Sequence, residues 1–316
     1  MTVEIEDPRL EALIDPDARP RRLWTGGEWV EGPVYVPAED CVYWSDIPND
    51  RVLRFSESDG ASVALHPAGY ANGHTLDREG RIVRCEHGRR RVSRVEPDGT
   101  LTTIADRYAG GRLNSPNDVV VKSDGTIWFS DPPYGIVSDR EGHRADSEQA
   151  GCFVFRCDPR DGALAVVSDA FEDPNGLAFS PDESILYVSD TSSARHQPGR
   201  HHLFACDVLN GGTRLAPPRP FAVCGHGVFD GFRVDRDGNL WTSAGESVEI
   251  YAPDGARLGR IALPEVVSKC TFGGRDGTTL FITATSSLYA LVTRTRSAVP
   301  TGAGTGSTEP GAGSPR

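Results

Sequence analysis

The chain has 316 residues, 38% of them hydrophobic, and a formal net charge of −12. This composition is sufficient for a packed core, whereas the negative charge argues against nucleic-acid binding, which requires a basic surface. No stretch approaches the roughly 18 consecutive apolar residues of a membrane-spanning helix, and the acidic segment Met1–Asp7 lacks the apolar region of a secretory signal. We therefore expect a cytoplasmic monomer or homodimer without membrane or nucleic-acid partners. The seven cysteines, an odd number without a C-x-x-C pair, are expected to be reduced and buried.

In chain order, three regions are predicted. Residues 1–21 form an N-terminal extension, the only place where a helix is expected. Residues 22–292 alternate short apolar runs with turns such as Asp59-Gly60 and Asp98-Gly99, which is typical of β-hairpins. Residues 297–316 are rich in Gly, Pro, Ser and Thr without an apolar period, so a disordered tail is expected there.

One pattern recurs six times within residues 22–292. Each copy has a short apolar strand, a turn with Asp and Gly, and a strand in which a large apolar residue precedes a small one. The small residues lie 40 to 59 positions apart: Ser45, Cys85, Ser130, Ser189, Ser243 and Thr283. Six all-β units of this length predict a six-bladed β-propeller of four-stranded antiparallel blades around a central channel. The last copy has three strands, so we expect Leu23-Trp24-Thr25 to supply its fourth strand and close the ring.

Polar residues occupy one position in five of the six copies, 13 or 14 residues before the small residue: Glu31, Asn72, Asn117, Asn175 and Asp230. Each Asn-Gly or Asp-Gly pair alone is explained as a turn. A shared register favours a site, because equivalent positions on the innermost strands of a propeller converge on its axis.

These oxygens would be poorly satisfied, and the carboxylates would repel one another, unless they bound a cation. One divalent metal ion held by Glu31, Asn117, Asn175 and Asp230 balances the two negative charges. Ca²⁺ fits an all-oxygen set best, and Mg²⁺, Mn²⁺ and Zn²⁺ are the alternatives.

The strand after each inner strand returns to the same end of the channel. Residues near its end are therefore predicted to line the substrate pocket. The predicted substrate contacts are Asn72, His87, Asn117, Asp131 and Tyr134. The long loops 135–151 and 192–202 are candidates for a lid.

Several segments resemble one known family. They are Asn72–Asp77, Arg84–Arg89, Arg112–Gly135 and Pro174–Glu183, and the resemblance extends over roughly residues 22–292. The chain is similar to the gluconolactonase/senescence marker protein/luciferin-regenerating family of metal-dependent propellers, and most similar to its bacterial gluconolactonase branch. The resemblance implies that Glu31, Asn175 and Asp230 are metal ligands and that Asn117 is a ligand or substrate contact. Animal members have a sugar-binding Arg where this chain has Ser115.

The expected function is a metal-dependent lactonase that opens a small-molecule lactone, such as gluconolactone, to the hydroxy acid. The metal polarises the carbonyl group, and Asp230 orients or deprotonates the attacking water. His87 or Tyr134 assists the leaving hydroxyl group. Two alternatives remain open: an organophosphate or ester hydrolase that uses the same ion, and a non-catalytic binding platform with a structural metal.

Overall fold

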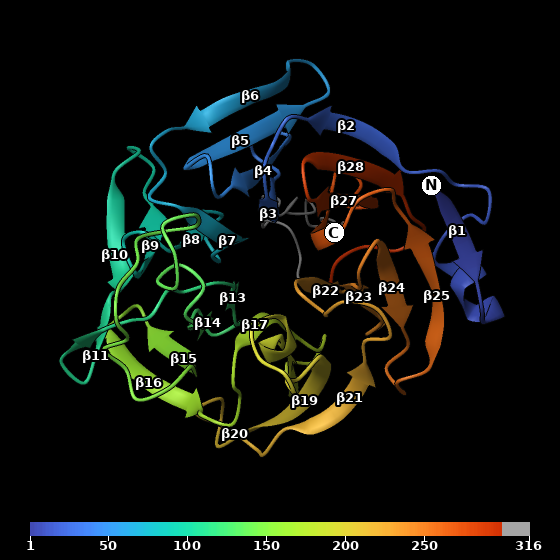
Figure 1. Ribbon diagram of the computed structural model, residues 1–316. Helices are drawn as coiled ribbons and strands as arrows, with labels where there is room; N and C mark the ends of the chain where they lie inside the picture. The colour runs from blue at the N-terminus through green and yellow to red at the C-terminus, as the bar shows by residue number, and fades with distance from the viewer. Residues whose placement is uncertain (299–316) are drawn as a thin grey trace, which may run out of the picture.

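The computed structural model describes residues 1–298, and nearly all of its regular structure is β-strand. Six antiparallel sheets are arranged around a ring (Figure 1), so the predicted six-bladed propeller is confirmed. The innermost strands of the six blades are β3 (Val30–Val36), β7 (Ala71–Leu76), β13 (Val119–Val121), β17 (Pro174–Phe179), β22 (Phe232–Val234) and β26 (Val267–Gly273).

In blades 1 to 4, the outer strands follow the inner strand in sequence. Blade 1 adds β4 (Cys41–Asp46), β5 (Arg51–Ser56) and β6 (Gly60–Leu65), and blade 2 adds β8 (Ile82–Glu86), β9 (Arg91–Val95) and β10 (Leu101–Ala105). Blade 3 adds β14 (Ile127–Asp131), β15 (Phe153–Asp158) and β16 (Ala163–Ser168). Blade 4 adds β18 (Ile185–Asp190), β19 (His202–Leu209), β20 (Arg214–Leu215) and β21 (Arg219–Val223). A hairpin of β11 (Arg107–Tyr108) and β12 (Gly111–Arg112) precedes blade 3, and the 3₁₀ turn η2 (Ser192–Ala194) precedes β19.

The N-terminal segment completes the last two blades. Blade 6 consists of β26, β27 (Thr279–Ala284), β28 (Ser287–Val292) and β2 (Arg21–Thr25), with Trp24 opposite Leu288, so the predicted closure of the ring is present. Blade 5 consists of β22, β23 (Leu240–Ser243), β24 (Ser247–Tyr251) and β25 (Arg257–Ala262), and β1 (Thr2–Ile5) adds a fifth strand beside β25. The short 3₁₀ helix η1 (Pro8–Ala12) buries Leu10 against this blade.

Large aromatic residues pack neighbouring blades together. Trp128 of β14 contacts Phe179 of β17 with ring centroids 5.3 Å apart, and Trp241 of β23 contacts Phe272 of β26 at 5.5 Å. Both tryptophans are fully buried. In these two blades, a tryptophan two residues before the small residue of the repeat therefore contacts the inner strand of the next blade.

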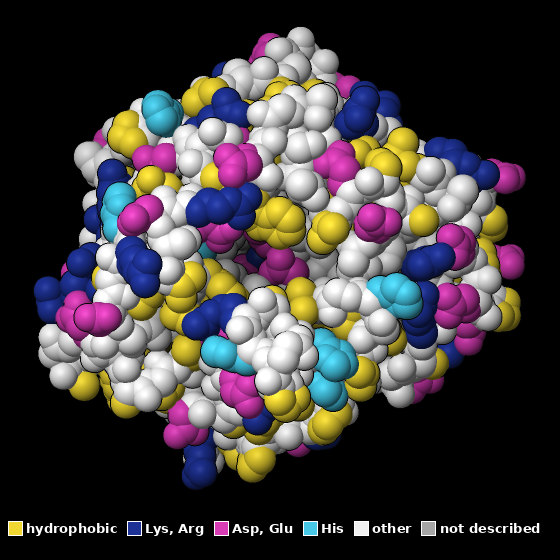
Figure 2. All heavy atoms as spheres, viewed as in Figure 1, with side chains coloured by type: hydrophobic (Ala, Val, Ile, Leu, Met, Phe, Trp, Pro, Cys, Tyr) yellow, Lys and Arg dark blue, Asp and Glu magenta, His cyan; other side chains and the backbone are white. Residues whose placement is uncertain are grey.

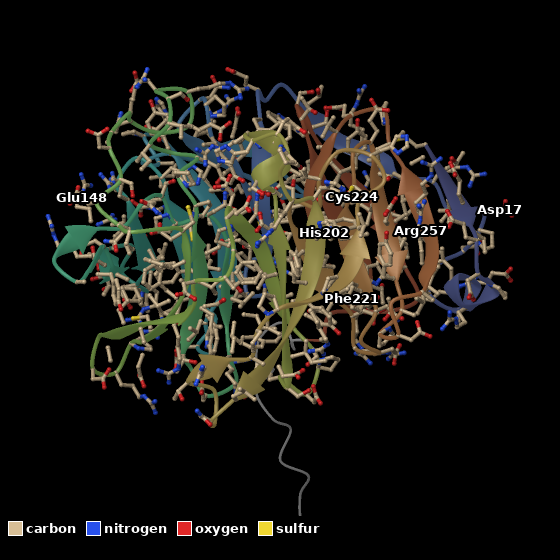
Figure 3. The ribbon with its side chains drawn as sticks, turned by 60° about the horizontal axis from the view of Figure 1, so that its bottom comes forward. Asp17, Glu148, His202, Phe221, Cys224 and Arg257 are labelled. Atoms are coloured by element: carbon tan, nitrogen blue, oxygen red, sulfur yellow. The ribbon has the colours of Figure 1, made fainter. Side chains whose placement is uncertain are left out.

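The seven cysteines are free, and six of them are buried. Figure 3 shows the strands running between the two faces of the ring, with Asp17 at its outer margin. Of the predicted tail 297–316, residues 299–316 lie outside the described residues, whereas Ser297 forms a bridge with Asp235. No helix in the described part of the chain combines the length and apolar character needed to cross a membrane.

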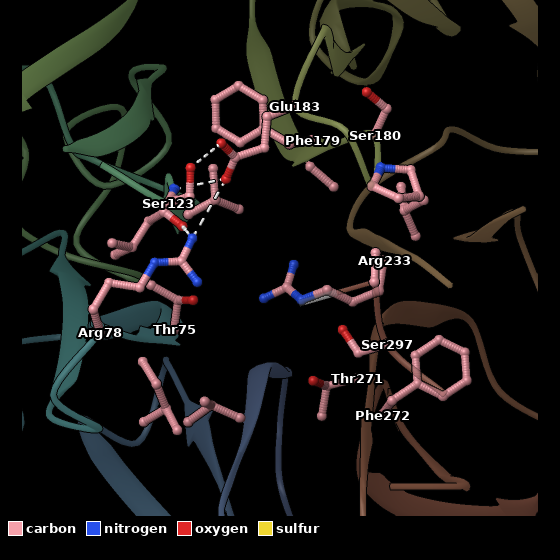
Figure 4. Close-up of a pocket in the computed structure, with 18 of the residues that line it drawn as sticks. Thr75, Arg78, Ser123, Phe179, Ser180, Glu183, Arg233, Thr271, Phe272 and Ser297 are labelled. Atoms are coloured by element: carbon pink, nitrogen blue, oxygen red, sulfur yellow. Dashed lines mark hydrogen bonds and ion pairs between the residues drawn. The ribbon is translucent and has the colours of Figure 1, made fainter. Parts of the chain in front are cut away.

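Two cavities lie at opposite mouths of the channel, because one is lined by the starts of the inner strands and the other by their ends. The cavity at the strand ends has a volume of about 500 Å³ (Figure 4). Arg233 extends into it, whereas Arg78 on the facing wall donates to the carbonyl oxygens of Lys122 and Val121 and to Glu183. On this wall of the cavity, the Arg78 guanidinium is therefore held by hydrogen bonds to the protein.

Candidate active site

The predicted metal ligands meet at the other mouth of the channel. Glu31 lies on β3, Asn175 on β17, and Asn117 and Asp230 lie just before β13 and β22. Together with Asn72 of β7, all four line one cavity of about 970 Å³. Figure 2 shows this mouth as a central hollow with acidic side chains at its base. The register shared by the repeats therefore corresponds to one place in the fold.

The small residue of the repeat positions this register. In each of three cases, a serine on the second strand of one blade donates to the backbone carbonyl of the site residue in the next blade. The three bonds join Ser45 Oγ to Asn72 O at 3.0 Å, Ser130 Oγ to Asn175 O at 2.6 Å, and Ser189 Oγ to Asp230 O at 2.8 Å. The repeat therefore fixes the height of these three site residues along the channel.

A glycine follows four of the five site residues, all but Asn117, and allows neighbouring inner strands to approach closely. The amide of Gly73 donates to Asn117 O at 2.9 Å, and the amide of Gly176 donates to Asp230 O at 3.2 Å. A Cβ on Gly73 would lie 2.5 Å from Asn117 O, and one on Gly176 would lie 2.3 Å from Asp230 O. These pairs are thus explained by packing within strands rather than by turns.

Burial and like charge oppose ionisation of the two acids. Burial raises the pKa of Glu31 well above its usual value, and Asp230 raises it further, while Lys269 lowers it. Burial raises the pKa of Asp230 to about 7, against the lowering effects of Lys269 and of a hydrogen bond with Asn175. The buried ammonium of Lys269 forms an ion pair with Asp118, which follows Asn117.

These donors fit a hard divalent cation. Two carboxylates and two amides supply only oxygen ligands, and Asn72 contributes a buried Oδ1 without a hydrogen-bond partner among the described residues. A cation or a ligand donor would satisfy these groups. No three His, Cys, Asp or Glu side chains within residues 1–298 form a metal-binding group, so a site here depends on amide ligands.

His87 lies behind the cavity wall rather than on it. Its Nε2 lies 3.2 Å from Asn72 Nδ2, and its Nδ1 lies 3.1 Å from Glu141 O. Burial lowers the pKa of His87 to about 4, so the ring is neutral near pH 7. With Nδ1 donating to the carbonyl oxygen of Glu141, Nε2 accepts from Asn72 Nδ2, which leaves Asn72 Oδ1 without a partner among the described residues. The structure therefore gives His87 a positioning contact with Asn72.

Tyr134 lines the cavity directly. Its hydroxyl group is hydrogen-bonded to Thr191 Oγ1, which also accepts from Asn175 Nδ2 at 3.2 Å. Burial raises the pKa of Tyr134, so the phenol stays protonated. Tyr134 thus presents a neutral hydroxyl group beside Asn175.

Asp131, predicted as a substrate contact, does not line the cavity. It is fully buried, and its Oδ2 accepts from the amide of Asn114 at 2.8 Å. Asp46 and Asp190, at equivalent strand ends, likewise accept backbone amides. A carboxylate at this position fixes the loop that precedes an inner strand, so Asp131 does not face the substrate cavity as predicted.

The two long loops contribute side chains that strand register could not reveal. Arg140 and Glu141 line the cavity from loop 135–151, and Arg195 lines it from loop 192–202. Ser115 is buried and donates to Pro132 O at 2.6 Å. In the sequence, only the length of the two loops indicated a role for them. Loop length does not specify that Arg140 and Arg195 face the cavity.

Comparison with known proteins identifies the family and supports the fold. Residues 29–286 match the family described as the SMP-30/Gluconolactonase/LRE-like region. A gluconolactonase of Zymomonas mobilis is 33% identical over 91% of this chain and 85% of its own length. The structure of a gluconolactonase from Xanthomonas campestris superimposes with a TM-score of 0.86 and 39% identity, covering 93% of this chain and 95% of that one.

A calcium-binding regucalcin from Agrobacterium tumefaciens shares the fold at a TM-score of 0.71 and 19% identity, over 89% of this chain and 95% of the other. The family match covers most of the propeller, from the start of β3 into blade 6. The chain belongs to the SMP-30/gluconolactonase/LRE-like family.

Proposed function

We propose that this protein is a divalent-metal-dependent lactonase that opens a sugar lactone to its hydroxy acid. The observation that carries the proposal is the convergence of Glu31, Asn117, Asn175 and Asp230 on one cavity of about 970 Å³. Membership of the family and the gluconolactonase names of its similar relatives support the choice of a lactone. Ca²⁺ is the proposed ion, because the donors are all oxygens.

The four side chains would hold the ion, which when bound supplies a Lewis acid that polarises the lactone carbonyl. Asp230, half-buried at the cavity, takes a proton from water as the water oxygen adds to the carbonyl carbon. The ring C–O bond then breaks, and the ring oxygen receives the proton from Asp230. The Tyr134 hydroxyl group donates a hydrogen bond to the substrate. One water is consumed, and one hydroxy acid is formed.

The test is acid release from a panel containing glucono-δ-lactone, a pentonolactone, δ-valerolactone and an organophosphate triester. Each substrate is assayed before and after chelation and after return of Ca²⁺, Mg²⁺, Mn²⁺ or Zn²⁺, and circular dichroism follows the fold. We expect chelation to abolish lactone opening in a folded protein and Ca²⁺ to restore it. Unchanged activity after chelation would contradict the proposal. Loss of activity only together with the fold would favour a structural ion, and turnover of the phosphotriester alone would favour the other hydrolase.

A further inference from the structure

A guanidinium on the cavity wall has no part in the chemistry described above. Arg195 lines the cavity from the loop after η2, and its Nη1 donates to Asp173 Oδ1 at 2.8 Å. The side chain of Asp173 is 2% exposed, whereas that of Arg195 is 27% exposed. Asp173 lies directly before β17 and two residues before Asn175, so Arg195 is anchored at the start of the strand that carries a candidate ligand.

Most of the hydrogen-bonding capacity of Arg195 is free. A guanidinium has five N–H donors. Within residues 1–298, the Arg195 side chain makes a single hydrogen bond, to Asp173. The buried carboxylate balances the positive charge, so the pair presents donors rather than a net charge. Arg140 differs, because it is half-exposed and forms ion pairs with both Glu28 and Glu141.

An acceptor from another blade complements these donors. Asn72 lines the same cavity, and its Oδ1 is buried without a hydrogen-bond partner among the described residues. A hydroxyl group both donates and accepts, so a polyhydroxylated ligand can accept from Arg195 and donate to Asn72. An anionic ligand would gain less, because Asp173 already balances the guanidinium charge.

We infer that Arg195 is a specificity-determining residue that binds the hydroxyl groups of a neutral sugar lactone and so selects it over an unsubstituted lactone. This inference rests on the proposed lactonase function. Hydroxyl groups held in this way gain charge-assisted hydrogen bonds that δ-valerolactone cannot form.

The experiment compares kcat/KM for glucono-δ-lactone and δ-valerolactone in the Ca²⁺-loaded protein. For Arg195→Ala we expect kcat/KM to fall about 10- to 100-fold for gluconolactone, mainly through KM, and about 3-fold or less for valerolactone. Arg200→Ala is the matched control. Arg200 lies in the same loop and pairs with buried Asp190, but it is not among the residues that line the cavity. Its substrate preference should equal that of the wild type.

The double variant Asp173→Asn/Arg195→Gln removes both charges together and should show the same loss of preference without leaving a buried acid unpaired. Melting temperatures verify folding of each variant. Equal losses on both lactones, or no change on either, would overturn the inference. A wild-type protein that opens neither lactone would instead refute the proposed function.

Discussion

Replacing Lys269 with Met should destabilise the propeller from inside its channel. Lys269 and its partner Asp118 have side chains only 1% and 2% exposed. Breaking a buried ion pair costs about 3–5 kcal/mol because the remaining charge is uncompensated. Asp118 keeps bonds from the amides of Val119 at 2.7 Å and Leu177 at 3.2 Å, and Arg233 lies 3.9 Å away. These contacts favour the lower figure, about 3 kcal/mol.

For a domain of this size, about 2 °C of melting temperature corresponds to 1 kcal/mol, so a decrease of about 6 °C is expected. Differential scanning calorimetry of Lys269→Met, Asp118→Asn and the double variant measures the coupling. The double variant should be more stable than the sum of the single effects predicts. Lys122→Met, which breaks the more exposed pair with Glu183, should cost about 1 kcal/mol or less. A Lys269→Met protein that melts like the wild type, or strictly additive effects, would refute the reasoning.

Three further outcomes are expected. Deleting residues 1–25 removes β1 and β2 and exposes the edge of β28, so the product should aggregate in size-exclusion chromatography, and a folded monomer would contradict the closure. Gly176→Ala places a Cβ 2.3 Å from Asp230 O and should weaken Ca²⁺ binding measured by titration calorimetry. Gly225→Ala, with no atom within 4 Å of its Cβ, should leave Ca²⁺ binding unchanged. Burial raises the pKa of Asp131 to about 7, so the folded state holds a proton that the unfolded state loses from near pH 4. Stability should therefore fall as pH rises from about 4 to 7, and Asp131→Asn should reduce that slope in melting experiments; an unchanged slope would exclude Asp131 as its source.

The fold and the ligand register were predictable because a propeller repeats the same contacts. Ser130 recurs in its position because its hydroxyl group donates to the next blade, at Asn175 O. Trp128 and Trp241 share a position in their blades because each packs on the neighbouring inner strand, at Phe179 and Phe272. Each contact constrains a residue type at a fixed spacing, so the spacing reveals the blade.

Features that break the repeat could not be predicted in this way. Strand β1 pairs with β25 through backbone hydrogen bonds, which leave little signal in side-chain type. Asp131 directly follows the small residue Ser130, a position predicted to lie near the substrate, but its carboxylate accepts from the amide of Asn114 and fixes that loop. The placement of Arg195 depends on a buried partner 22 residues earlier in the chain, Asp173. Such pairings are set by tertiary structure rather than by local pattern.

The central claim is that one cation at this mouth activates a lactone while Asp230 accepts the proton from water. Titration of Ca²⁺ into the metal-free wild type, Glu31→Gln and Asp230→Asn, with acid release from glucono-δ-lactone followed throughout, tests it most directly. Glu31→Gln should bind Ca²⁺ more weakly and recover activity as Ca²⁺ is raised. Asp230→Asn should still bind, through its amide oxygen, but remain about 10²- to 10⁴-fold slower at saturation, because an amide cannot accept the proton. Full recovery of Asp230→Asn at saturating Ca²⁺ would contradict the account and leave Asp230 as a ligand only.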